Sequence, residues 1–201
     1  LKNLIMENRY DFVDALNEDY GNRSKNTSIM TDAYSIIPDI NNAIKNIKKW
    51  TKVEKRSSNF PFGLFGAKSY VKYEPLGTVG MISPWNFPVN LSFGPLAAIF
   101  AAGNQVMHKP SELTPITSEL IKSLCDKTYD ENEFATFLGG PEVGEAFTKL
   151  HFDITRNVVG GTHCTHLVRI CLIWSCLKHF IDQIKGFVRS ISLFILPQPK
   201  F

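Results

Sequence analysis

The feature that most restricts the fold is a regular alternation of short apolar runs and amphipathic segments between residues 74 and 150. The apolar runs have the length and composition of buried strands, at residues 78–82, 105–108 and 134–138. Each run precedes a loop and then a segment with helical periodicity, at residues 91–102, 115–127 and 142–150. This alternation predicts an α/β fold with a doubly wound parallel sheet.

The N-terminal part of the chain predicts two further helices. Apolar residues of segment 1–16 fall on one helical face, and Gly21 is expected to end that helix. In segment 37–50, isoleucines recur at steps of three and four residues, with lysines between them. Residues 60–66 are rich in Phe, Gly and Pro and predict a loop, whereas residues 69–73 alternate like a strand.

The helix at residues 115–127 has a clear predicted start and a clear predicted core face. Thr114 is the expected N-cap, with Pro115 at the first helical position. Ile116, Leu120 and Leu124 recur at four-residue steps, so we expect them to form its buried face.

Composition restricts the class of protein and its surroundings. The net charge of +3 is too small to indicate a nucleic acid or membrane partner. The longest uncharged apolar run after residue 153 has eight residues, whereas a bilayer span needs roughly 20. We therefore expect no transmembrane segment, and the charged first 20 residues predict no signal peptide. Cys125 is the only cysteine before residue 154, which favours a reducing, cytoplasmic compartment.

The composition changes abruptly at residue 154. Residues 154–201 contain six Lys or Arg and one acid, which gives +5 and leaves −2 for the preceding residues. Three of the four cysteines and three of the five histidines also lie in this segment. Its apolar residues follow no single period, so no secondary structure is predicted there.

The first loop that follows a predicted strand surrounds Asn86 with prolines at positions 84 and 88. Proline restricts the backbone, which suits a side-chain amide that acts as a preorganised donor. An amide N–H directed at a developing alkoxide can contribute about 3 kcal/mol to a barrier. The alternative is an ordinary turn in which Asn86 caps the next helix.

The second and third loops carry residues suited to a nucleotide. Lys109 and Glu112 would bind a ribose by donating to and accepting from its hydroxyls; the alternative is two solvated surface charges. Gly139 and Gly140 would let an adenine lie close to the backbone, and the helix N-terminus behind them would favour a phosphate. Glycine-rich turns are also common without a ligand, and no Gly-x-Gly-x-x-Gly segment occurs.

Taken together, these segments resemble the aldehyde dehydrogenase family. The resemblance rests on the order and spacing of five pieces, at residues 74–88, 94–98, 101–104, 109–112 and 114–115. It covers about residues 1–153, and the segments at 21–24 and 91–95 are most similar to the coniferyl aldehyde dehydrogenase branch.

The resemblance implies a partial aldehyde dehydrogenase fold with three regions. Residues 1–73 would form the N-terminal helices and the start of an oligomerisation strand. Residues 74–153 would form a partial NAD(P)-binding domain, and residues 154–201 a divergent tail of unknown structure.

The resemblance also implies roles for the loop residues. Asn86 would be the oxyanion-hole amide. The residues expected along the cofactor are Ile82, Ser83, Pro84, Trp85, Lys109, Ser111, Glu112, Gly140 and Pro141. Among these, Lys109 and Glu112 would contact the adenosine ribose, and Pro141 the adenine. The cofactor would be NAD or NADP, with NAD favoured because a glutamate on the ribose repels a 2′-phosphate.

The residues that would perform the chemistry are absent from this sequence. The family's nucleophile is a cysteine in a Gly-Gln-x-Cys segment and its general base is a glutamate in a Glu-Leu-Gly-Gly segment; neither segment occurs. Residues 160–163 are similar to the family's pyrophosphate loop, but displaced by about one residue. The spacing of tail cysteines and histidines does not match a closed zinc site, so no metal is expected. The change at residue 154 suggests a shifted reading frame or a degraded gene.

Three interpretations follow. The first is an aldehyde dehydrogenase by descent, inactive as this chain, whose full-length relatives would oxidise an aldehyde, such as the aromatic coniferyl aldehyde, to the acid. The second is a non-catalytic chain that binds nucleotide or associates with its own copies or with full-length subunits. The third is a remnant without function.

Overall fold

The computed structural model describes residues 1–58 and 60–157. The chain separates into two units, Leu1–Val168 and Arg169–Phe201, and the second lies entirely outside the described residues. Within the described residues, no helix is long and apolar enough to cross a membrane.

A four-stranded sheet occupies the centre of the first unit. Its strands are β3 (Thr78–Ile82), β4 (Gln105–Lys109), β5 (Phe134–Thr136) and β6 (Ile154–Asn157). They lie in the order β5-β4-β3-β6, and all three neighbouring pairs are parallel. The predicted parallel sheet is confirmed. It continues past residue 153, because β6 pairs with β3 although its residues had been assigned to the tail.

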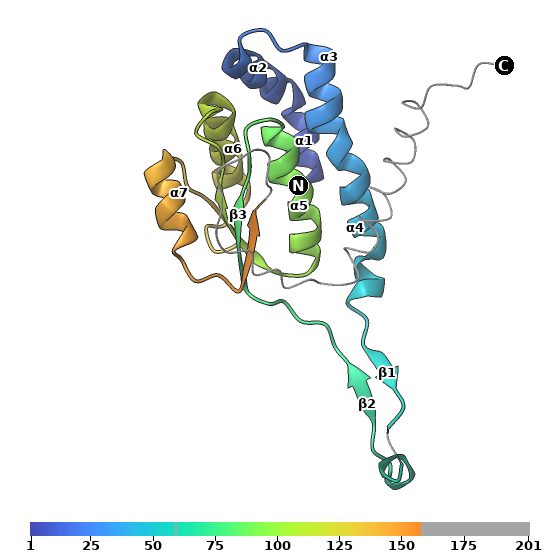
Figure 1. The fold of residues 1–201 in the computed structure, drawn as a ribbon. Coiled ribbons are helices and arrows are strands. Elements are labelled where there is room, and N and C mark those ends of the chain that lie inside the picture. Colours follow the sequence, from blue (N-terminus) through green and yellow to red (C-terminus); the bar gives the residue numbers. More distant parts are fainter. Residues whose placement is uncertain (59, 158–201) are drawn as a thin grey trace, which may run out of the picture. The chain divides into compact units, whose positions relative to one another are not determined.

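Three helices connect these strands: α5 (Pro88–Ala101), α6 (Pro115–Thr128) and α7 (Pro141–Thr148). The steps β3-α5-β4 and β4-α6-β5 run in one direction across the sheet, whereas β5-α7-β6 returns beyond β3. Right-handed crossovers then place α5 and α6 on one face and α7 on the other. Figure 1 shows α5 and α7 on opposite sides of β3. The predicted doubly wound arrangement is confirmed, and its direction changes between β3 and β6.

Alternation along β3 explains how the two faces are filled. Val79 and Met81 are buried in the core shared with α5 and α6. Gly80 faces the other way, where a Cβ atom would lie 2.5 Å from the ring of Phe152. That ring packs on Phe147 of α7 with a centroid separation of 5.0 Å. Glycine is therefore required here for the second helical layer to approach the sheet.

The N-terminal helices form a further layer over α5 and α6. These helices are α1 (Lys2–Glu7), α2 (Arg9–Tyr20) and α4 (Ile37–Trp50). α2 packs against α6 and α4 against α5, and the Phe12 ring meets the edge of Phe93 at 5.7 Å. Gly21 ends α2 in a left-handed conformation, as predicted. The connecting segment, for which no helix was predicted, contains α3 (Lys25–Ser28), a π-helical turn (Ile29–Ala33) and a 3₁₀ turn (Tyr34–Ile36).

Helix α6 differs from its prediction in two ways. Its fully buried stripe contains Thr117, Ile121 and Cys125, one position later than the predicted Ile116, Leu120 and Leu124. Leu120 and Leu124 are partly buried and pack against the core, so the predicted face lies beside the fully buried stripe.

The predicted start of α6 is confirmed, with Thr114 at the N-cap and Pro115 as the first helical residue, but the cap is made by another side chain. Thr114 occupies the N-cap position, but its hydroxyl makes no capping hydrogen bond. Asp19 of α2 accepts hydrogen bonds instead from the backbone N–H groups of Ile116 and Thr117, at 3.0 and 2.8 Å. A carboxylate at a helix N-terminus satisfies the free N–H groups and the positive end of the helix dipole.

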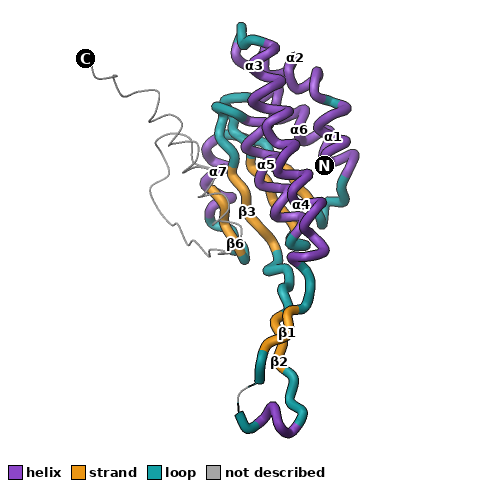
Figure 2. The backbone as a smooth tube through the Cα atoms, turned by 90° about the vertical axis from the view of Figure 1, so that its right-hand side faces the viewer, coloured by secondary structure: helices purple, strands orange, loops and turns teal. Residues whose placement is uncertain are grey.

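A separate hairpin precedes the sheet. It pairs β1 (Glu54–Arg56) with β2 (Ser69–Val71) in antiparallel register, and its far end carries a 3₁₀ turn, Phe62–Phe65 (Figure 2). Only the second strand was predicted, because the first is short and fully charged. The apolar side chains of the turn are exposed.

Candidate functional site

The three predicted loops meet at one edge of the sheet. The N–H of Ser83 donates to the carbonyl of Lys109 at 3.1 Å, which joins the carboxyl ends of β3 and β4. The N–H of Phe137 donates to the carbonyl of His108 at 2.8 Å, which joins β4 to β5. Ligands of doubly wound sheets bind at this edge, beside the point where the strand order reverses.

Lys109 and Glu112 form an ion pair at the end of β4. The Lys109 side chain is only 3% exposed, and its Nζ donates to Glu112 Oε2 at 3.1 Å and to the carbonyl of Pro110 at 2.7 Å. Partial burial would raise the pKa of Glu112, but hydrogen bonds from its own backbone N–H and from Lys109, with the lysine charge, lower it. Glu112 is therefore ionised at neutral pH with 41% of its side chain exposed. Lys109 and Glu112 are therefore not two solvated surface charges, which was the alternative interpretation.

Asn86 lies between the end of β3 and the start of α5. Its side chain does not cap α5, whose N-cap is Phe87 without a side-chain bond. Among the described residues, its Oδ1 is buried without a partner and no hydrogen bond engages its Nδ2. The amide group thus retains its donor capacity at the sheet edge.

Ser83 belongs to a buried polar group beneath this edge. Its hydroxyl lies 2.7 Å from His108 Nε2 and 2.8 Å from the hydroxyl of Ser92. Burial, with the nearby charge of Lys109, lowers the pKa of His108 to about 3. The imidazole is therefore neutral and supports the strand ends from within. Because the Ser83 side chain is buried and occupied, only its backbone is available to a cofactor.

The third loop precedes α7. Gly139 adopts a φ of +144°, and a Cβ there would lie 2.4 Å from Val143. Gly140 is the N-cap and Pro141 the first residue of α7. The N–H of Gly140 donates to Glu142 Oε1 at 3.1 Å, so the helix carries its own carboxylate where a phosphate was expected.

The remaining predicted residues lie along the same edge. Ile82 ends β3 and is partly buried, as is Pro84, whereas Trp85 is 45% exposed. The Ser111 hydroxyl accepts from the N–H of Leu113 at 3.2 Å and so shapes the second loop. The expected pyrophosphate loop at 160–163 lies outside the described residues.

No nucleophile emerges from the described part of the chain. Cys125 is buried in the core, and burial raises the pKa of its thiol to about 12. A thiol in this state is inert. In residues 1–58 and 60–157, no cluster of three or more His, Cys, Asp or Glu could hold a metal ion.

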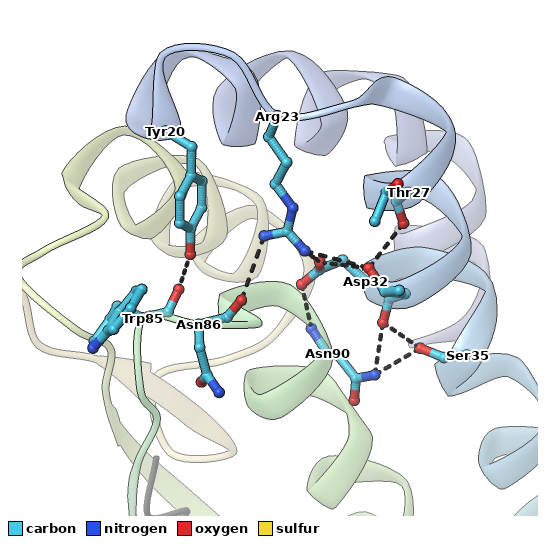
Figure 3. Close-up of polar contacts among 9 residues, drawn as sticks. Tyr20, Arg23, Thr27, Asp32, Ser35, Trp85, Asn86 and Asn90 are labelled. Carbon is cyan, nitrogen blue, oxygen red and sulfur yellow. Dashed lines mark hydrogen bonds and ion pairs between the residues drawn. The ribbon is translucent and has the colours of Figure 1, made fainter. Parts of the chain in front are cut away.

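The structure adds three residues to the site that were not predicted. Tyr20 ends α2, Arg23 follows it, and Asp32 lies in the π-helical turn. Tyr20 and Arg23 donate to the carbonyls of Trp85 and Asn86, and Asp32 binds Arg23 (Figure 3). Their only sequence signal is that Arg23 falls in the 21–24 segment similar to the coniferyl branch. No spacing rule connects them to Asn86, more than 50 residues later.

The fold and its loop edge define a class: an α/β cofactor-type domain with an amide donor and a Lys–Glu pair at its strand ends. A model of the aldehyde dehydrogenase family matches residues 1–190, and the chain belongs to this family. The match continues beyond Asp153, where the resemblance had been expected to end.

Individual relatives agree with this assignment. A probable coniferyl aldehyde dehydrogenase of Caulobacter vibrioides is 48% identical over 151 residues, 75% of this chain and 31% of the relative. A coniferyl aldehyde dehydrogenase of Pseudomonas sp. is 42% identical over 166 residues, 83% and 34% of the two chains. The substrate-bound Staphylococcus aureus AldH structure has a TM-score of 0.70 and 36% identity, covering 77% and 33%.

This chain thus spans about a third of the length of the curated relatives it matches. Structures of the same fold hold NAD+ or NADP+. At identities of 24% and 15%, these two likenesses concern the fold alone.

Proposed function

We propose that this chain forms the adenosine-binding part of an NAD(P)-dependent aldehyde dehydrogenase and supplies its oxyanion-hole amide. The observation that carries the proposal is the Lys109–Glu112 pair at the carboxyl end of β4, next to the Asn86 loop. A buried ammonium orients the carboxylate, and its exposed part is available to a ligand. Hydroxyl groups of a ribose match this acceptor.

The residues present fit a nicotinamide dinucleotide. Glu112 would accept hydrogen bonds from the ribose hydroxyls, and Lys109 would hold Glu112 in place. Gly140 offers backbone without a side chain, and Pro141 offers an apolar ring to an adenine. Because Glu112 is ionised at neutral pH, it would repel a 2′-phosphate, which favours NAD over NADP.

Asn86 would act on the substrate. When bound, NAD(P) would accept a hydride from the aldehyde-derived carbon. The Asn86 Nδ2 would donate a hydrogen bond to the oxygen on which negative charge develops. A preorganised donor of this kind is effective because it is already oriented before the charge forms.

Calorimetric titration with AMP, NAD and NADP tests this proposal. We expect weak binding by the 201-residue chain and about tenfold weaker binding in each of Lys109→Met and Glu112→Gln, since about 1.4 kcal/mol corresponds to tenfold. The preference for NAD over NADP should shrink in Glu112→Gln. Lys122→Met is the matched control, because Lys122 pairs with Asp126 on the exposed face of α6.

Two results would contradict the proposal. Unchanged affinity in both site variants would place the nucleotide elsewhere. Absence of binding by a folded sample, with circular dichroism typical of α/β structure, would reject adenosine binding by this chain.

For the whole protein, we propose an aromatic aldehyde of the coniferyl type as the substrate. The support is the identity of 48% and 42% to coniferyl aldehyde dehydrogenases. Ligand-observed NMR should show saturation transfer to coniferyl aldehyde and not to a straight-chain aldehyde. Equal transfer to both would contradict aromatic selectivity.

A second candidate function is association with a copy of this chain or with full-length subunits. The hairpin turn exposes four large apolar side chains, those of Phe60, Phe62, Leu64 and Phe65. Exposed apolar surface of this kind is typical of protein contacts. Sedimentation should show concentration-dependent association that is weakened in Phe62→Ser and Phe65→Ser. A monomer at all concentrations would reject this candidate.

A further inference from the structure

We infer that Arg23 is a positioning residue for Asn86: its guanidinium, held by Asp32, clamps the loop after β3 against the N-terminal helices. The inference deepens the proposed function, because it rests on the role of Asn86 as the oxyanion amide. Three groups of contacts support it, and Figure 3 shows the hydrogen bonds and the ion pair among them.

Arg23 divides its donors between two partners. Its Nη2 donates to Asp32 Oδ2 at 2.6 Å and to the Thr31 hydroxyl at 3.3 Å, while its Nη1 donates to the carbonyl of Asn86 at 3.5 Å. The side chain is 12% exposed and that of Asp32 is 1% exposed. A planar guanidinium can serve two acceptors in fixed directions, which a single ammonium cannot.

Asp32 connects the same clamp to the start of α5. Its second oxygen, Oδ1, accepts from the backbone N–H of Asn90 at 3.3 Å. The Asn90 side chain donates to the carbonyl of Thr31 at 2.8 Å and to the hydroxyl of Ser35 at 2.6 Å. Both ends of the 83–87 loop are therefore fixed, one by β3 and the other by these bonds to α5.

Ring contacts complete the clamp. The guanidinium lies 5.0 Å from the ring centroid of Tyr20 and 5.3 Å from that of Phe87. The Tyr20 hydroxyl donates to the carbonyl of Trp85, the residue before Asn86. Consecutive carbonyls at Trp85 and Asn86 are thus both held by side chains from the end of α2 and the turn that follows it.

This arrangement matters because, in residues 1–58 and 60–157, no hydrogen bond holds the side-chain amide of Asn86. The direction of its donor therefore depends on the backbone of the loop. An oxyanion donor has to be placed to within about 0.5 Å, so the clamp supplies the preorganisation that the side chain lacks.

The test compares loop order and stability in matched variants. Arg23→Lys keeps the charge beside Asp32 but removes the second donor arm and the planar stacking surface. Tyr20→Phe removes only the hydroxyl that bonds to Trp85. Lys25→Met is the control, because Lys25 pairs with Asp14 at an exposed position nearby. NMR order parameters report the loop, and urea unfolding reports the fold.

For the parent we expect order parameters of about 0.85 at the backbone amides of Trp85 and Asn86, which is the value typical of rigid backbone. In Arg23→Lys they should fall toward about 0.6, with the urea midpoint nearly unchanged, and Tyr20→Phe should act mainly at Trp85. The control should match the parent. Unchanged loop order in Arg23→Lys would overturn the inference, because the pair would then stabilise the fold without positioning Asn86.

These measurements separate the inference from the proposed function. Loop order is recorded without nucleotide, and Arg23 is not one of the residues expected on the adenosine. Loss of order in Arg23→Lys without any nucleotide binding would support the clamp and contradict adenosine binding. Nucleotide binding, with loop order unchanged in Arg23→Lys, would support adenosine binding and contradict the clamp.

Discussion

The buried imidazole of His108 predicts a pH dependence of stability that can be assigned to one residue. His108 is fully buried, its Nε2 is bonded to Ser83, and its Nδ1 has no partner among the described residues. Protonation would place a charge and an N–H without an acceptor in the core. Burial accordingly lowers the pKa to about 3, whereas an unfolded histidine titrates near 6.5.

The sign and size of the effect follow from these two pKa values. Between pH 3 and 6.5 the unfolded chain binds one more proton than the folded chain, so stability falls as the pH falls. The contribution of His108 is fully present above pH 6.5. Relative to pH 7, linkage gives a loss of about 0.7 kcal/mol at pH 6 and about 1.9 kcal/mol at pH 5.

Urea unfolding of the parent and of His108→Gln between pH 5.0 and 7.5 measures this contribution. Glutamine retains a polar partner for Ser83 but does not titrate, so its stability should vary by about 2 kcal/mol less across the range. Contributions from the carboxylates are common to both proteins and cancel. His151→Gln, at an exposed position, should follow the parent. Parallel pH profiles for the parent and His108→Gln would refute the assignment of a neutral buried imidazole.

Three further outcomes are expected. Asp19→Ala should lower the free energy of unfolding by about 1–2 kcal/mol, because α6 loses its cap, while Asp14→Ala should change it little; equal effects in urea titrations would contradict the capping role. Gly80→Ala should lower the free energy of unfolding by about 1–3 kcal/mol, because the added methyl group overpacks against the Phe152 ring. Adding Phe152→Leu to Gly80→Ala should recover part of this loss. If the two substitutions instead have additive effects on the free energy of unfolding, the ring is not the obstacle. The 201-residue chain should produce no NAD(P)H from aldehydes above buffer background; turnover abolished by substituting tail cysteines would contradict this.

Local pattern was enough to predict the central part of the fold. The apolar runs that contain β3, β5 and most of β4 were each bounded by turn residues, and their alternation with helices predicted parallel pairing. Gly21 was recognised as a helix end because glycine adopts the left-handed conformation most easily. Strand β1 was missed because a three-residue charged segment has no apolar period.

The candidate site was only partly predictable, because its loops follow from local pattern whereas the burial of its side chains depends on tertiary packing. The loops and their order follow from the strands, so Asn86, Lys109 and Glu112 were found at one sheet edge. Whether Lys109 is solvated or buried depends on what packs over it, which the sequence does not encode locally. Ser83 was expected along the cofactor, and the sequence did not reveal that its hydroxyl contacts the buried His108 and Ser92.

The sequence by itself determined the doubly wound sheet and the three loops, since strand and helix periods repeat within a few residues of one another. Tertiary structure alone decided that Asp19 caps α6, 97 residues away from Ile116, and that Arg23 and Asp32 hold the Asn86 loop. A free helix N–H donates to whichever acceptor the packing places beside it, and a loop carbonyl accepts from whichever donor lies there. Such partners leave no spacing in the sequence, because the distance along the chain between them is set by the intervening elements and not by the bond they form.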